Sequence, residues 1–148
     1  MNALRATAAL AWLCIGLSSA AWGQTITVSA DPAPLVVATA LAGAEPDPVT
    51  DATTTYDVAV GAATARIVAR LGTALPPGVA LELELEAPPG ATSVGPVALT
   101  LLDQDVVVGI PAGTNASGLA ISYTLSATAQ AGVIGPQTPT VLLTVTSP

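Results

Sequence analysis

The chain has 148 residues, a formal net charge of −7, 51% hydrophobic residues and only 9% charged residues. Its three basic residues are all arginines, so it lacks the basic surface that nucleic acids and anionic membranes require. Val, Leu and Ile recur with a clear period, which argues against a disordered chain. The length suffices for a single domain with its own core.

Residues 1–23 have the order of a secretory signal peptide. Arg5 comes first, an apolar run follows, and small residues lead to an expected cleavage after Gly23. Cleavage two or three residues earlier is an alternative. A second alternative is an uncleaved anchor, although the apolar run is shorter than the roughly 20 residues that span a bilayer. The segment predicts a secreted protein, extracellular or at the cell surface, with no membrane span after cleavage.

Cys14 is the only cysteine and lies within this segment. Leu13 before it is not small, which disfavours a lipoprotein signal. Residues 24–148 then hold no cysteine, histidine or lysine, and loss of Arg5 takes the net charge from −7 to −8. Those three residue types supply most nucleophiles, proton shuttles and soft metal ligands. We therefore expect no enzyme, no cofactor and no small-molecule substrate.

Residues 24–44 are predicted to form an N-terminal arm with two short apolar runs around a Pro-rich stretch. One interpretation is an ordinary first strand of the same domain. The other is a strand that leaves its domain and completes the sheet of a neighbour, a head-to-tail contact that generates an open polymer. In that case the assembly residues are Ile26, Val28, Leu35, Val36 and Val37.

Short runs with a period of two, separated by Pro and Gly clusters, predict strands throughout the remainder of the chain. The spacing of these runs, about 8 to 12 residues, favours a sandwich or barrel. The predicted fold is all-β: over residues 24–148, a single Ig-like β-sandwich of about 7–9 short antiparallel strands. A jelly roll would show the same pattern. The predicted strands are residues 25–29, 35–40, 53–60, 65–71, 81–86, 96–102, 105–110, 119–125 and 140–146.

Leucines alternate with Glu82, Glu84 and Glu86 in the clearest of these strands, which predicts an acidic stripe on one face of a sheet. A hairpin with the preceding strand would bring Arg70 near Glu82 and Arg66 near Glu86, and we expect this charge balance. The alternatives are a cation site or a carboxylate pair for glycoside hydrolysis.

The other polar candidates are few. Asp103 and Asp105 have the spacing of a calcium-loop fragment and are weak metal candidates, but Asp also favours turns. Asn115 begins a glycosylation sequon in a Gly-rich turn. Tyr56 and Tyr123 are the only aromatics after residue 23, too few for a sugar-stacking platform, and Tyr123 is expected in the core.

Several stretches resemble small uncharacterised secreted bacterial β-proteins, over more than half of the chain, towards its C-terminus. They are ATSVG (residues 91–95), DVVVGIP (105–111), SGLAISYTLSAT (117–128) and the closing strand 140–146. The resemblance implies no particular activity. In layout the chain also resembles Ig-like subunits of extracellular fibres, but it lacks their common disulfide and an aromatic residue near the C-terminus.

These features together predict a non-enzymatic structural subunit of an extracellular or cell-surface assembly, such as a filament, coat or matrix. Its expected partner is another copy of itself, and the expected mechanism is strand exchange through the arm. The alternative is a monomeric secreted binding module that recognises a ligand or surface through residues 88–95 and 111–118. An enzyme that uses carboxylates alone is a third and remote class.

Overall fold

The computed structural model describes residues 23–37, 44–131 and 139–148. The predicted signal segment and Cys14 therefore lie outside the described residues, apart from Gly23. Within the described ranges, no helix is long and apolar enough to cross a membrane. The described part of the chain has nine strands and one short 3-10 turn: β1 (Thr25–Val28), β2 (Val49–Ala59), β3 (Ala65–Leu71), β4 (Val79–Leu85), β5 (Thr92–Ser93), β6 (Val97–Ala98), β7 (Gln104–Ile110), β8 (Asn115–Ala127), η1 (Ala129–Ala131) and β9 (Val141–Thr146).

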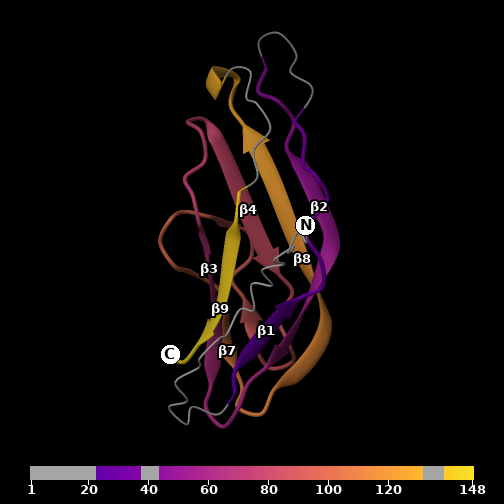
Figure 1. Cartoon of the computed structure of the whole chain (residues 1–148), viewed down its shortest axis with the longest axis vertical. Helices are drawn as coiled ribbons and strands as arrows, with labels where there is room; N and C mark the ends of the chain where they lie inside the picture. The colour runs from indigo at the N-terminus through magenta and orange to yellow at the C-terminus, as the bar shows by residue number, and fades with distance from the viewer. Residues whose placement is uncertain (1–22, 38–43, 132–138) are drawn as a thin grey trace, which may run out of the picture.

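The strands form two antiparallel sheets. The five-stranded sheet has the order β1-β2-β8-β4-β6, and the four-stranded sheet has the order β5-β7-β3-β9. The strands run close to the long axis of the molecule (Figure 1). The predicted all-β sandwich is thus confirmed, with nine strands, while the immunoglobulin-like subtype stays a prediction.

The core lies between the two sheets and follows the period of two. In β4 the leucines are at most 4% exposed, while Glu84 and Glu86 point to solvent and Glu82 is half-buried. Tyr123 is buried, as predicted, and so is Tyr56. In β9 the residues Val141, Leu143 and Val145 pack against the core, also as predicted. The largest fully buried apolar side chains are Tyr56, Ile67, Leu83, Leu85, Ile110 and Ile121.

Three turns share one pattern, in which proline comes first and glycine third. They start at Pro76, Pro88 and Pro111, and in each the fourth residue donates its N–H to the carbonyl of that proline, at 3.1, 3.0 and 3.3 Å. The glycines have φ values of 79°, 84° and 75°. The second residues, Pro77, Pro89 and Ala112, have no positive φ, and a positive φ at the third position alone is typical of a type II turn, which glycine adopts without strain.

The predicted hairpin of the Arg-bearing and Glu-bearing strands is wrong. Arg66 and Arg70 lie on β3 in the four-stranded sheet, whereas β4 with its glutamates lies in the five-stranded sheet. The turn at Pro76 therefore carries the chain from one sheet to the other. A connection that begins at Gly72 joins β3 to β4. The N–H of Gly72 donates to the carbonyl of Thr140, next to β9.

Two predicted strands are shorter than expected. The run 96–102 forms only β6, because the chain then crosses to the other sheet: Leu99 N–H donates to the carbonyl of Leu81 at 2.9 Å, whereas the carbonyl of Thr100 accepts the N–H of Leu71 on β3 at 2.7 Å. After the crossing, Leu102 N–H bonds to the Thr100 hydroxyl at 3.2 Å, and Thr100 N–H bonds to the Gln104 side chain at 3.0 Å. Of the run 35–40, the described residues 35–37 are not in a strand, and 38–40 lie outside the described residues. The two-residue β5 was not predicted.

Candidate functional site

The N-terminal arm lies along β2 at the edge of the five-stranded sheet. β1 pairs with β2 over four residues, from Thr25 opposite Ala59 to Val28 opposite Tyr56. The register continues past the strand, because Ser29 N–H donates to the carbonyl of Thr55 at 2.9 Å. In the single chain the arm thus occupies its own sheet, as an ordinary first strand would, and the exchange with a neighbour stays a prediction.

The five predicted assembly residues divide into two groups. Ile26 and Leu35 pack against the core, and Val37 is half-buried. Val28 and Val36 are exposed, by 38% and 65%. The arm therefore fills part of the core with some side chains while it presents others to solvent.

Asp51 holds the middle of the arm. Its carboxylate is buried at 8% exposure, accepts the hydroxyl of Thr53 at 2.9 Å and accepts the N–H of Ala33 at 3.3 Å. Ala33 lies between two prolines, so its N–H is the only backbone donor of that stretch. Burial raises the pKa of Tyr123, and the nearby charges of Asp51 and Asp31 raise it further.

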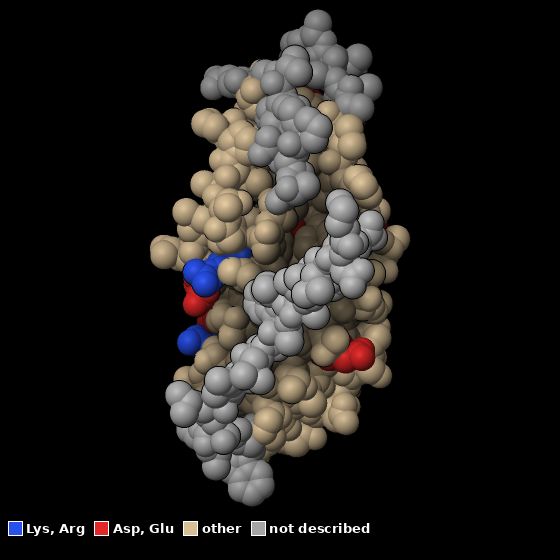
Figure 2. All heavy atoms as spheres, in the orientation of Figure 1, with Lys and Arg blue, Asp and Glu red and all other residues tan. Residues whose placement is uncertain are grey.

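Asp103 and Asp105 each face an arginine. Arg66 Nη1 lies 3.2 Å from an oxygen of Asp105, and Arg70 Nε lies 3.4 Å from an oxygen of Asp103. Figure 2 shows blue and red atoms together at the left of the molecule and a separate red patch at the right, with neutral residues over most of the described surface between them. These carboxylates therefore balance the arginines, the role that the glutamates were expected to have. Within the described ranges, no three His, Cys, Asp or Glu residues gather as metal ligands would.

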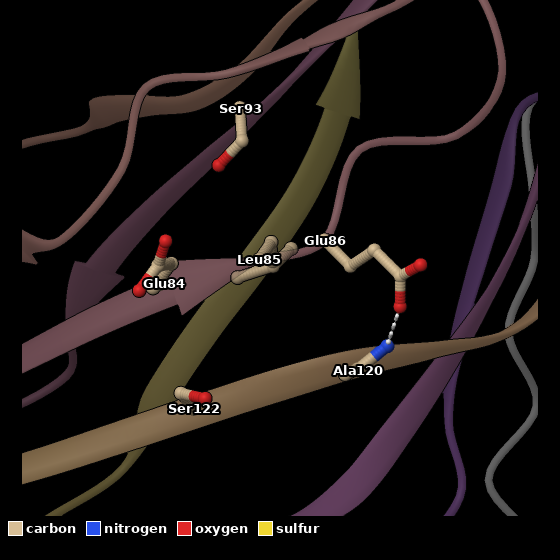
Figure 3. A pocket seen from close by; sticks show the side chains of 6 residues that line it. All are labelled: Glu84, Leu85, Glu86, Ser93, Ala120 and Ser122. Atoms are coloured by element: carbon tan, nitrogen blue, oxygen red, sulfur yellow. Dashed lines mark hydrogen bonds between the residues drawn. The ribbon is translucent and has the colours of Figure 1, made fainter.

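The acidic stripe borders an open groove of about 370 Å³ where β4 continues past Leu83, which is opposite the first residue of β6, Val97. Glu86 reaches across to β8 and accepts the N–H of Ala120 at 2.9 Å, while Glu84 points towards Ser93 (Figure 3). The two carboxylates thus diverge. A carboxylate pair for glycoside hydrolysis has to converge on one bond, and this pair does not. Lining residues are Glu84, Leu85, Glu86, Ser93, Ala120 and Ser122.

The two loops predicted as binding tips come together at one end of the sandwich. A Cβ atom placed on Gly90 would lie 2.9 Å from Cγ of Pro111, so the two turns touch. Nearby, Gly113 N–H donates to the carbonyl of Gly61 at 2.7 Å, which ties the second loop to the β2–β3 connection. Asn115 is exposed at the start of β8. The sequence alone did not place these loops side by side.

β9 is the longest of the four strands that end the sheets. β5 and β6 have two residues each and β1 has four, whereas β9 has six and pairs with β3 without a register shift. Its sequence VLLTVT contains no charge, proline or glycine. The strand was predicted, but its position at an edge was not. The one sequence signal was the absence of charge over residues 140–146.

The fold and these surfaces define a β-sandwich domain with little charge, an arm that pairs with β2 at one sheet edge, and an edge strand, β9, that pairs with β3 alone within the described residues. Comparison of the chain with protein-family models, with curated proteins and with solved structures found no match.

Proposed function

We propose that the chain is a non-enzymatic structural subunit of an extracellular or cell-surface assembly, built from copies of itself. The observation that carries the proposal is the arm. It supplies Ile26 and Leu35 to the core from the edge of a sheet, yet within the described residues β1 pairs with β2 alone. An edge strand of this kind is what subunits exchange in strand-addition polymers.

Exchange of the arm between copies would use the same hydrogen bonds and the same packing that the arm makes within its own domain. If the arm leaves β2, the slot beside β2 and the gap under Ile26 are open to the arm of the next copy, which restores the same ladder and packing. The contact is head-to-tail and therefore repeats without closing on itself. The predicted secretion and the absence of Cys, His and Lys from residues 24–148 support a structural role over a catalytic one.

Electron microscopy of the negatively stained protein, before and after concentration, tests self-assembly. Filaments or sheets support the proposal, and uniform small particles at every concentration contradict it. Deletion of residues 24–33 then tests the arm. A variant that folds but no longer assembles supports exchange, whereas an unfolded variant indicates an ordinary strand.

A disulfide tests exchange without removal of the arm. Thr25 and Ala59 are opposite each other in the β1–β2 ladder, and paired Cα atoms about 5.5 Å apart suit a disulfide. In a C14S background, T25C/A59C oxidised after assembly should give a ladder of covalent oligomers on a non-reducing gel. Only internally bridged monomers from assembled material would show that the arm stays on its own domain.

The contact between Gly90 and Pro111 favours a second candidate, a monomeric binding module. The loops 88–95 and 111–118 then form the recognition surface, and Ser93 of the first loop also lines the groove beside Glu84. A sedimentation coefficient that does not change with protein concentration would favour this candidate over assembly.

A further inference from the structure

We propose that the outer edge of β9 pairs antiparallel with β9 of a second copy, which joins two four-stranded sheets into one sheet of eight strands. The choice of a second copy as the partner rests on the proposed function. The β9 contact uses the four-stranded sheet, whereas the arm pairs within the five-stranded sheet.

The backbone of β9 has hydrogen-bonding groups directed away from the sheet. Gly72 N–H donates to the carbonyl of Thr140 at 2.8 Å, in the same register as the pair Arg70–Leu142. Bonded pairs alternate along an antiparallel ladder, so every second residue of β9 from Thr140 faces β3. The residues between them direct their N–H and C=O groups outward: Val141, Leu143 and Val145. Within the described residues, no strand other than β3 pairs with β9.

The other edges carry the features that prevent such pairing. β5 and β6 are only two residues long, and β1 is followed by a stretch with prolines at 32 and 34. Short strands and prolines are common means of blocking edge-to-edge contact, and so are charged side chains and bulges. β9 has none of these: it has six residues, no charge, no proline and no register shift.

The distribution of charge favours a second copy at this edge. The arginines lie on the four-stranded sheet, each paired with an aspartate, whereas Glu82, Glu84 and Glu86 lie on the five-stranded sheet. Two copies with a net charge of −7 each would thus meet along the balanced sheet. The neighbouring edge strand β1, Thr25–Val28, is also uncharged.

The outward backbone groups define one register that uses the whole strand. A two-fold axis through Leu143 places Val141 opposite Val145 of the second copy in bonded pairs, and Leu142 opposite Thr144 in non-bonded pairs. Leu142 is 39% exposed on the outer face, and pairing would cover it. Val141 and Val145, both half-buried, would extend the core across the contact.

Cysteine variants test the contact and its register together. In a C14S background, L142C and T144C mixed under mild oxidation should give a disulfide dimer, since non-bonded pairs bring Cα atoms to about 4.5 Å. Neither variant alone should do so, because each cysteine then faces Leu or Thr. The control mixture is L142C with T92C, at the opposite edge of the same sheet. No dimer in the first mixture, or equal yields in all of them, would overturn the proposal.

Charged variants test it in solution. L142D/T144D places aspartates opposite one another across the contact, and we expect loss of the dimer in sedimentation velocity. The matched control T92D/V94D adds the same charge at exposed sites of the opposite edge and should leave the dimer intact. An unchanged dimer in L142D/T144D overturns the β9 contact. Filaments of the L142D/T144D variant would show that arm exchange does not need the β9 contact. Dimers of the parent chain without filaments would support β9 pairing and contradict arm exchange.

Discussion

Two buried hydroxyl groups on β2 differ in their hydrogen bonding. Tyr56 is fully buried, and its hydroxyl donates to the carbonyl of Glu86 at 2.5 Å, which ties β2 to the end of β4 across the intervening β8. Thr54 is 1% exposed, and its hydroxyl has no hydrogen-bond partner among the residues that the structure describes. Removal of the hydrogen-bonded hydroxyl should lower the free energy of unfolding, whereas removal of the unpaired one should leave it unchanged or raise it.

Tyr56→Phe should destabilise the fold. The substitution keeps the ring but leaves the carbonyl of Glu86 without this donor, at a cost of about 1–2 kcal/mol. Urea denaturation measures the difference. Tyr123→Phe is the matched control, because Tyr123 is also buried but donates no hydrogen bond within the described residues. An equal loss in both variants would contradict the role given to the Tyr56 hydroxyl.

Thr54→Val should leave stability unchanged or raise it, by up to about 1 kcal/mol, because the variant has the same shape and removes an unpaired buried hydroxyl. Thr55→Val on the same strand, at a half-buried site, is the control and should have less effect. A clear loss of stability in Thr54→Val, measured by the same urea titration, would mean that the hydroxyl has a stabilising contact.

Alkaline pH should unfold the protein through its tyrosines. Burial and, to a lesser degree, the charge of Glu86 raise the pKa of Tyr56 above its usual 10.0, and burial also raises the pKa of Tyr123. A raised folded-state pKa gives stability that is full below about pH 10 and is lost as pH rises through the folded-state pKa. The urea midpoint should fall above pH 10, less steeply in Tyr56→Phe. A midpoint independent of pH there would contradict this prediction.

At the scale of elements, the contact between two turns can be measured through their glycines. Gly90 and Gly113 both have a positive φ, of 84° and 75°, but only Gly90 has a close neighbour where a Cβ would lie, Pro111. Gly113→Ala should cost about 1–2 kcal/mol from conformation alone. Gly90→Ala should cost more, since Pro111 must also move. Equal losses of unfolding free energy in Gly90→Ala and Gly113→Ala would show that the turns at Pro88 and Pro111 are not in close contact.

The sequence predicted which side chains of a strand face inward, because alternation is local. In β4 the leucines are buried, and in β3 both arginines face outward, as predicted. It did not predict which sheet a strand joins. The alternation of Arg66 and Arg70 is the same whether they lie beside glutamates in a hairpin or beside Asp105 on β7 and Asp103 just before it. The choice depends on contacts between strands distant in sequence, which a period of two does not encode.

For the site, the same limit applies. The arm was found from its apolar runs and prolines, but its attachment through Asp51 and Ala33 depends on where β2 lies. The groove beside Glu84 lies beyond the first residue of β6, Val97, which is opposite Leu83; the chain before it contains Gly95, with a φ of 88°, and Pro96, which has no N–H to donate. Gly95 and Pro96 are visible in the sequence, but their position beside Glu84 depends on the pairing of β4 with β6, which a period of two does not encode.

At the scale of the whole molecule, charge opposes association of any two copies. Each has a net charge of −7. Raising the ionic strength from about 0.01 M to about 0.1 M shortens the screening length from about 30 Å to about 10 Å. Self-association, measured by sedimentation velocity, should therefore strengthen with salt over this range. An added neutral osmolyte of equal osmolality is the control. Weakening with salt would mean that ion pairs hold the copies together.

The two ends of the described chain meet. The side chain of Gln24 donates to the hydroxyl of Ser147 at 3.3 Å, so the start of β1 and the end of β9 leave the sandwich at one end. A short peptide between residues 148 and 24 would close the polypeptide into a ring without displacing a strand. That ring reopened within the exposed turn at Gly113 gives a circular permutant with every strand neighbour intact. In this permutant the arm is covalently joined to the domain at both of its ends, so it can no longer insert into the sheet of another copy.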